Sequence, residues 1–138
     1  MIRVRKITIT IREFPYDKKG LNINDELLWL SDVLCLFDSK RDKEKSKFGL
    51  FIELIKARKQ KEVLTSDELA ERAHLSRGTI IHHIHDLEDR GYVISKDNKY
   101  LLSEKNIEFI FRDIKRDFDD FYDEIKKVVK KLDQELEL

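Results

Sequence analysis

The spacing of apolar residues changes along the chain from a period of two to a helical period, and this change predicts the order of the elements. Residues 2–14 alternate, as in Ile7-Thr8-Ile9-Thr10-Ile11, which predicts a strand with one apolar face. Residues 25–37 carry a wide apolar stripe and predict a helix, with Asn24 as its N-cap. A charged connector leads to a second helical stripe over residues 48–60.

The segment 65–103 contains two short helical patterns separated by a turn and followed by two strand patterns. Thr65 and Glu68 fit a capping box at the start of the first helix, and Ser76 fits the N-cap of the second. Gly91 suits the left-handed residue that ends this second helix. The order predicts a helix-turn-helix with a β-wing, a unit whose second helix can enter the major groove of DNA.

The stretch LSRGTIIHHIHDLEDRGYV, residues 75–93, resembles the recognition-helix pattern of winged helix-turn-helix transcription regulators of the ArsR and MarR type. The matching positions are Thr79, Ile80, His83, Ile84, Leu87, Gly91 and Val93. Ile81 departs from the pattern, because these regulators more often carry a polar residue there. The resemblance covers about residues 48–103 and implies a DNA-binding regulator, with a repressor favoured over an activator by family habit.

The C-terminal segment, residues 104–138, has no Gly or Pro, and its apolar side chains recur every seven residues. Two interleaved sets form a heptad seam: Ile107, Phe111, Ile114, Phe118, Phe121, Ile125, Val128 and Leu132. A helix of this length extends about 50 Å, further than a small winged-helix core can cover. We therefore expect this segment to dimerise two copies, similar to the terminal helix of PadR-like regulators. An intramolecular helical hairpin is the alternative.

The expected fold class is mainly α with a small β component. It comprises a strand and helix extension (1–39), a winged helix-turn-helix domain (48–103) and a long C-terminal helix (104–138). The residues expected to contact double-stranded DNA are Ser76, Arg77, Thr79, Ile81, His82 and His85 in the second helix, and Lys96, Asn98 and Lys99 in the wing. Two such helices related by a two-fold axis would meet successive faces of the major groove, about 34 Å apart, on a near-palindromic operator.

The distribution of charge is partly unfavourable to DNA binding. The whole chain of 138 residues has a formal net charge of zero. Residues 62–103 hold eight acidic residues and five Lys and Arg, a net charge of −3, whereas DNA-binding modules usually show a basic surface. Residues 40–61 hold nine basic residues and three acidic ones, a net charge of +6. That band is either a phosphate-facing surface or a solvated face.

Other chemistry has weaker support in the sequence. His82, His83 and His85 crowd one turn, but no paired-Cys or HExxH spacing accompanies them, so we expect neither a metal site nor a cofactor. A Gly-rich phosphate loop and a nucleophile motif are missing, so an enzyme is not expected. The single Cys35 lies on the apolar side of its helix and is expected to be buried.

Three alternatives to a plain DNA-binding dimer remain open. A winged helix can serve protein–protein contact, a regulator can respond to a metal, and Trp29 with the Phe-rich helices could line the pocket of an unidentified small-molecule effector. No apolar run approaches the length that crosses a membrane, and the N-terminus lacks the shape of a signal peptide. We expect a cytoplasmic protein without a membrane partner.

Overall fold

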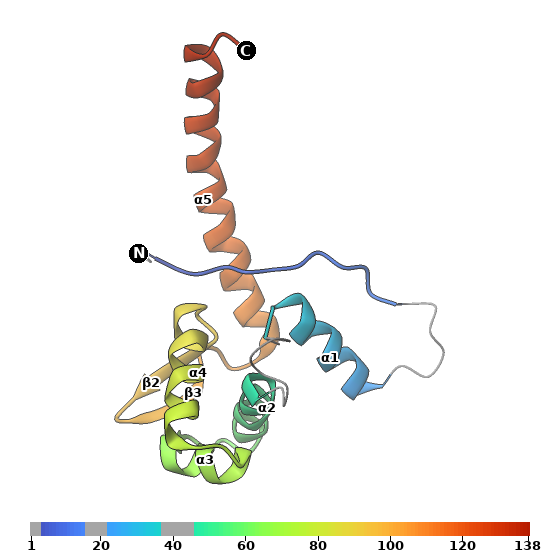
Figure 1. Ribbon diagram of the computed structural model, residues 1–138, viewed down its shortest axis with the longest axis vertical. Coiled ribbons are helices and arrows are strands. Elements are labelled where there is room, and N and C mark those ends of the chain that lie inside the picture. The colour runs from blue at the N-terminus through green and yellow to red at the C-terminus, as the bar shows by residue number, and fades with distance from the viewer. Residues whose placement is uncertain (1–3, 16–21, 37–45) are drawn as a thin grey trace.

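The computed structural model describes residues 4–15, 22–36 and 46–138 (Figure 1). Its elements are α1 (Ile23–Val33), α2 (Ser46–Lys59), β1 (Leu64–Thr65), α3 (Ser66–Ala73), α4 (Arg77–Asp89), β2 (Val93–Lys96), β3 (Lys99–Leu102) and α5 (Ile107–Glu135). Helices dominate, and the strands form one antiparallel sheet in the order β1-β3-β2. The expected fold class, mainly α with a winged helix-turn-helix, is confirmed.

The helix-turn-helix forms where its capping residues predict it. The hydroxyl of Thr65 accepts a hydrogen bond from the Glu68 N–H, and the Glu68 carboxylate accepts one from the Thr65 N–H, each at 3.2 Å. His74 then adopts a left-handed backbone with φ of 55° and ends α3. Ser76 caps α4 by accepting from the Thr79 N–H at 3.1 Å. The two caps hold the turn that sets the direction of α4.

The wing is a hairpin closed by a two-residue turn. Val93 pairs with Leu102 and Lys96 pairs with Lys99, so Asp97 and Asn98 alone form the turn. Both have positive φ, 52° and 61°, as a type I′ turn requires. The two-residue strand β1, which the sequence did not predict, pairs Leu64 with Tyr100. It ties the start of α3 to the sheet.

The core lies between α2, α3, α4 and the sheet, and the first turns of α5 complete it. Leu50, Leu69, Ile80, Ile84 and Leu87 are fully buried. Ile110 and Ile114 of α5 belong to the same cluster. Each buried aliphatic side chain contributes about 1.5–3 kcal/mol through its removal from water. Burial therefore fixes the face of α4 that points inward, and with it the face that remains outside.

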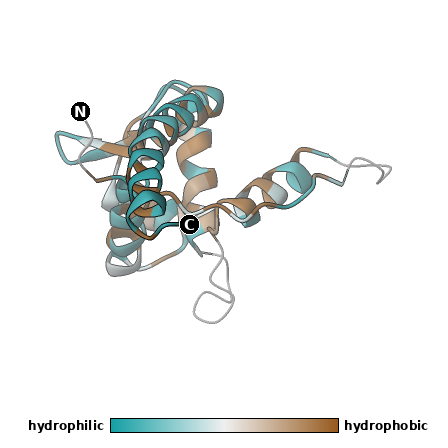
Figure 2. Cartoon of the chain, turned by 90° about the horizontal axis from the view of Figure 1, so that it is seen from above, coloured by the Kyte–Doolittle hydropathy of each residue, from teal (hydrophilic) through white to brown (hydrophobic). Residues whose placement is uncertain are grey.

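The N-terminal part differs from the expectation. The described residues 4–15 form no strand, although they run alongside the body with Lys6 N–H donating to Asp89 and Thr10 N–H donating to Val33. Alternation gives a segment an apolar face, but a strand also needs a neighbouring edge with which to pair. Most of α1 lies to one side of the winged-helix body (Figures 1 and 2).

The boundaries of α1 also correct two predictions. Its N-cap is Asn22, not Asn24, because Asp25 stands three residues after Asn22 and closes a capping box with it. The helix ends at Val33, and Cys35 adopts a left-handed backbone with φ of 55° just beyond it. Cys35 is partly exposed where burial was expected. Residue 37, the predicted end, lies outside the described residues.

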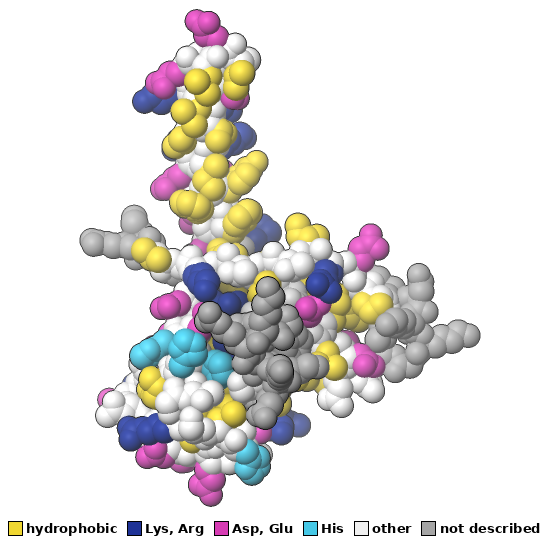
Figure 3. Space-filling model, viewed as in Figure 1, with side chains coloured by type: hydrophobic (Ala, Val, Ile, Leu, Met, Phe, Trp, Pro, Cys, Tyr) yellow, Lys and Arg dark blue, Asp and Glu magenta, His cyan; other side chains and the backbone are white. Residues whose placement is uncertain are grey.

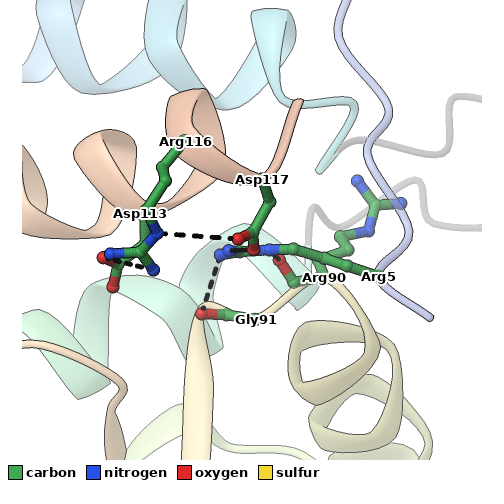
Figure 4. Close-up of polar contacts among 6 residues, drawn as sticks. All are labelled: Arg5, Arg90, Gly91, Asp113, Arg116 and Asp117. Atoms are coloured by element: carbon green, nitrogen blue, oxygen red, sulfur yellow. Dashed lines mark hydrogen bonds and ion pairs between the residues drawn. The ribbon is translucent and has the colours of Figure 1, made fainter. Parts of the chain in front are cut away.

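Arg5 joins three segments that are distant in the sequence (Figure 4). Its side chain is 8% exposed and forms an ion pair with Asp117 of α5. It also donates to the backbone carbonyl of Arg90 at 3.1 Å. The guanidinium covers Gly91, where φ is 78°. This contact fixes the N-terminal segment and the base of α5 against the end of α4.

Replacing Gly91 with Ala should lower the free energy of unfolding by about 1–2 kcal/mol, the usual cost of a left-handed backbone for an L-residue. An added Cβ would also lie 2.5 Å from the Arg5 guanidinium. Urea denaturation followed by circular dichroism measures the effect. Gly49→Ala is the matched control, because a Cβ there meets nothing within 4 Å and α2 should become more stable. Equal stability of the two variants would contradict this account.

Candidate nucleic-acid interface

The outward face of α4 is polar and accessible. Its inward face, formed by Ile80, Ile84 and Leu87, is fully buried. Ser76, Arg77, His82 and His85 are exposed, and Thr79 and Ile81 are half-buried. The first turn of α4 and the whole of α3 lie at the end of the molecule away from the free part of α5 (Figure 1). A duplex could therefore approach this end without meeting the long helix.

Arg77 is the most accessible cation of this face. Its side chain is 71% exposed, and its Nε lies 3.7 Å from a carboxylate oxygen of Asp67, which is exposed as well. An exposed pair at this distance contributes between zero and about 1 kcal/mol. The guanidinium is therefore free to leave Asp67 for a stronger acceptor, such as the O6 and N7 atoms of guanine.

The wing presents its own polar side chains at the tip of the hairpin. Lys96, Asn98 and Lys99 are all exposed. Lys96 and Lys99 flank the tight turn and Asn98 lies within it, so the paired strands fix where these side chains begin. All nine residues predicted to contact DNA are thus at least partly accessible in one chain.

The three neighbouring histidines divide between the surface and the interior. His82 and His85 are both exposed, and Figure 3 shows histidine side chains on the surface of the winged-helix body. His83 is only 8% exposed, and its Nε2 lies 2.7 Å from the Ser46 hydroxyl of α2. It therefore connects α4 to α2, in keeping with the structural role that the family resemblance implies. Among the described residues, no group of three or more His, Cys, Asp or Glu side chains is arranged to hold a metal ion.

Asp86, on the inner side of α4, is the centre of a charged cluster. Its carboxylate lies 2.8 Å from Lys47 Nζ, 3.0 Å from Arg90 Nε and 3.5 Å from Lys6 Nζ. Burial alone would raise the pKa of Asp86, but the hydrogen bond from Lys47 and the charges of Arg90, Lys47 and Lys6 together hold that pKa below its ordinary value. Arg90 is itself buried and donates to the Leu34 carbonyl at 2.6 Å.

Asp86→Asn should therefore cost about 1–3 kcal/mol of stability at neutral pH, because it leaves the buried Arg90 Nε without its charged acceptor. A carboxyl whose folded pKa is depressed contributes stability above its unfolded pKa and loses it as pH falls through the folded pKa. The difference between variant and parent should shrink below about pH 4. Urea titrations at several pH values measure it. Asp97→Asn at the exposed wing tip is the control, and an equal loss there would refute this role of Asp86.

The cluster also bears on the net negative charge of residues 62–103, because part of that charge is neutralised by contacts within the fold. Lys6 and Lys47 come from outside this segment and face its Asp86. Glu62 pairs with Arg72 at 2.9 Å, and Glu68 is held in the cap of α3. Three of the eight acidic residues are thus engaged within the fold, although Asp67 remains exposed beside Arg77. The basic band is divided too: Lys47 points inward, and residues 40–45 lie outside the described residues.

The heptad seam of α5 changes surroundings halfway along the helix. Ile114 is 4% exposed in the core, Phe111 packs against that core, and Ile107 is half-buried. Beyond Asp117 the seam is exposed, with Phe121 at 59%. The exposed seam residues are Phe118, Phe121, Ile125, Val128 and Leu132. The yellow side chains in the upper part of Figure 3 belong to this unpartnered half of α5.

An apolar cavity of about 310 Å³ lies between α1 and the first turn of α5. Trp29 and Ile107 line it, together with Phe14, whose ring packs edge-on against Trp29 at 5.2 Å. The indole N–H of Trp29 donates to the Glu13 carbonyl. The effector pocket expected near Trp29 would correspond to this cavity.

Comparison with known families now adds to the geometry. A family described as an HTH domain matches residues 52–100. This match supports a DNA-binding regulator of the helix-turn-helix class. It runs from within α2 to within β3 and so covers both helices of the motif and most of the wing. No curated protein and no solved structure matches the chain.

The sequence did not predict the ion pairs that hold α4 in place from its inner side. Arg5 with Asp117 and Lys6 with Asp86 join residues more than 75 positions apart, and isolated charges carry no local signal of such pairing. The left-handed Gly91, which Arg5 covers, was the one visible indication of a close approach. None of the helices in the described ranges combines the length and apolarity that crossing a bilayer requires.

Proposed function

We propose that this protein is a sequence-specific transcription regulator that binds DNA as a homodimer, in the manner of winged-helix regulators of the ArsR and MarR type. The observation that carries the proposal is the outward face of α4, which stays accessible while its opposite face anchors the core. The family match to residues 52–100 supports the same class.

Recognition would combine base contacts from α4 with backbone contacts from the wing. Arg77 would pair with a guanine, and the side chains of Thr79 and Ile81 would touch a thymine methyl group. His82 and His85 would add contacts along the groove. Lys96, Asn98 and Lys99 would reach phosphates or the minor groove and hold the register of the protein on the duplex.

The unpartnered half of α5 supports the dimer. Large apolar side chains that share one face of a helix rarely stay in water, and here the remainder of the same seam is already buried against the core. A second copy carries the same face at the same length, so it can cover the whole of it. We propose that the seam predicted from the sequence divides into two parts. Its exposed residues form the interface: Phe118, Phe121, Ile125, Val128 and Leu132. Its first three residues, Ile107, Phe111 and Ile114, instead serve the fold of the single chain.

A two-fold dimer calls for a near-palindromic operator whose half-sites are separated by whole turns of the duplex. Occupation of such a site next to a promoter would exclude RNA polymerase, which makes repression the simpler outcome. A regulator of this kind acts where the chromosome is, so a bacterial or archaeal cytoplasm is the compartment that goes with the proposal.

Selection of genomic fragments by the purified full-length protein tests the proposal. We expect recovery of a short inverted repeat and a band-shift whose affinity falls steeply as salt rises, because phosphate contacts release counterions. Binding without sequence preference would contradict a specific regulator. A failure to bind DNA at low salt, together with capture of a protein through α4, would favour the protein–protein alternative.

A further inference from the structure

The exposed half of α5 has two different flanks beside its apolar seam. In heptad notation, Phe118, Ile125 and Leu132 occupy a, and Phe121 and Val128 occupy d. The e positions that follow d are Tyr122, Val129 and Leu136, all exposed and apolar in character. The g positions that precede a are Asp117, Glu124 and Lys131. One flank therefore extends the apolar face, while the other is charged.

Charge is also divided along the helix. Residues 117–124 include five acidic residues and no Lys or Arg, whereas residues 126–131 include four Lys and no acidic residue. A parallel, in-register pair would lay acidic block beside acidic block and lysine block beside lysine block. Like charges brought together at an interface are unfavourable and select against that arrangement.

From these two asymmetries we infer that two copies of α5 pair in antiparallel orientation through residues 118–136. The inference rests on the dimer proposed above and specifies its geometry. In a parallel pair each g residue faces an e residue of the next heptad, which would bury Glu124 against Val129 and Lys131 against Leu136 of the second copy. In an antiparallel pair e faces e and g faces g, so apolar meets apolar and charge meets charge.

The register follows from the same residues. Placing Glu124 opposite Lys131 of the second copy forms two symmetry-related ion pairs. It also sets Ile125 against Val128, and Phe121 against Leu132, as alternating a and d layers require. The two-fold axis then passes between residues 126 and 127, which is the middle of the exposed apolar face from Phe118 to Leu136. The charge pairing and the extent of the face thus point independently to one register.

This geometry places the two winged-helix units at opposite ends of a rod. The two α5 helices would start about 60 Å apart along the rod, at 1.5 Å per residue. The centres of two half-sites one turn apart are separated by only about 34 Å. We therefore expect the half-sites of the operator to be separated by more than one turn of the duplex.

Cysteine cross-linking in the full-length chain with Cys35→Ser tests the orientation without DNA. We expect a mixture of the Glu124→Cys and Lys131→Cys chains to form a disulfide-linked dimer under mild oxidation. Each chain alone should link less readily, since at 1.5 Å per residue identical positions are offset along the axis by about 7 Å for residue 124 and about 13 Å for residue 131, against about 3 Å between residues 124 and 131. The matched control is a mixture of Glu124→Cys with Val129→Cys, which a parallel pair would link and an antiparallel pair would leave apart.

The outcomes separate this inference from the proposed function. Linkage of positions 124 and 129 would overturn the antiparallel arrangement and leave a dimeric DNA-binding regulator in place. A dimer by sedimentation that links in neither mixture would overturn it as well, because α5 would not form the interface. A monomer by sedimentation would refute both this inference and the dimer, while selection of genomic fragments tests DNA binding separately.

Reversal of charge provides a second test at the same positions. Glu124→Lys and Lys131→Glu should each weaken dimerisation, because each places like charges opposite one another. The double variant restores opposite charges across an antiparallel interface and should recover the parent's dissociation constant. In a parallel pair these two positions do not meet, so the double variant would show the combined loss of the two single ones, which would overturn the inference.

Discussion

Phe121→Asp should convert the protein from a dimer to a monomer and lower its affinity for a two-half-site operator by about 10²–10⁴-fold, the usual gain from linking two binding modules. Phe121 belongs to the exposed part of the seam and is 59% exposed in the single chain. A carboxylate at this position would be buried without a partner in the dimer, which carries a penalty of several kcal/mol. The same carboxylate would remain in water in the monomer, so the fold should survive.

Analytical ultracentrifugation and band-shift titration on full and half operators measure the two effects. We expect the variant to bind a single half-site as weakly as one winged-helix unit of the parent does. Lys130→Asp is the control, because position 130 lies on the side of α5 opposite the seam. If the Phe121→Asp protein remained dimeric, with unchanged operator affinity, α5 would not form the dimer interface.

The local elements could be predicted because their signals are local. The capping box at Thr65, the N-cap at Ser76 and the left-handed Gly91 each depend on residues within a few positions of one another. The inward face of α4 follows from the helical repeat of its aliphatic residues. The residues of α4 that are not on this aliphatic face must point outward, which explains why its predicted DNA contacts are at least partly accessible.

Two features of the fold depended on contacts that sequence periodicity does not specify. The alternation of residues 2–14 predicted a strand, but the described part of this segment lies against α4 and α1 without a strand to pair with. The heptad repeat of α5 is uniform along the sequence, yet its first half completes the chain's own core. A repeat reports that a face is apolar, and tertiary packing decides what covers it.

The ion pairs on the inner side of α4 could not be predicted for the same reason. Asp86 is one of several acids in its helix, and its depressed pKa arises only because Lys6, Lys47 and Arg90 converge on it in space. In the net charge of residues 62–103, Asp86 weighed against DNA binding. In the fold it instead holds the inner side of α4, while the outer side keeps its exposed Arg77 and histidines.

Arg77→Ala should weaken specific binding by about 1–3 kcal/mol per half-site and relax the preference at one base position. That loss corresponds to roughly 5- to 150-fold in the affinity of each half-site, since 1.4 kcal/mol is a factor of ten. A lost bidentate contact to guanine accounts for it, and loss of the weak pair with Asp67 contributes little. Selection of operators with the variant, followed by titration on the parent operator, measures both parts.

Two further variants distinguish base recognition from charge alone. Arg77→Lys keeps the cation but lacks the planar fork, so it should lose specificity while retaining non-specific affinity. Arg112→Ala removes an exposed arginine from α5, where it pairs with Glu108, and should leave the operator affinity unchanged. If Arg77→Ala and Arg112→Ala weakened binding equally, with no change in base preference, then Arg77 would act only through its charge. The outward face of α4 would then not be the surface that distinguishes one operator from another.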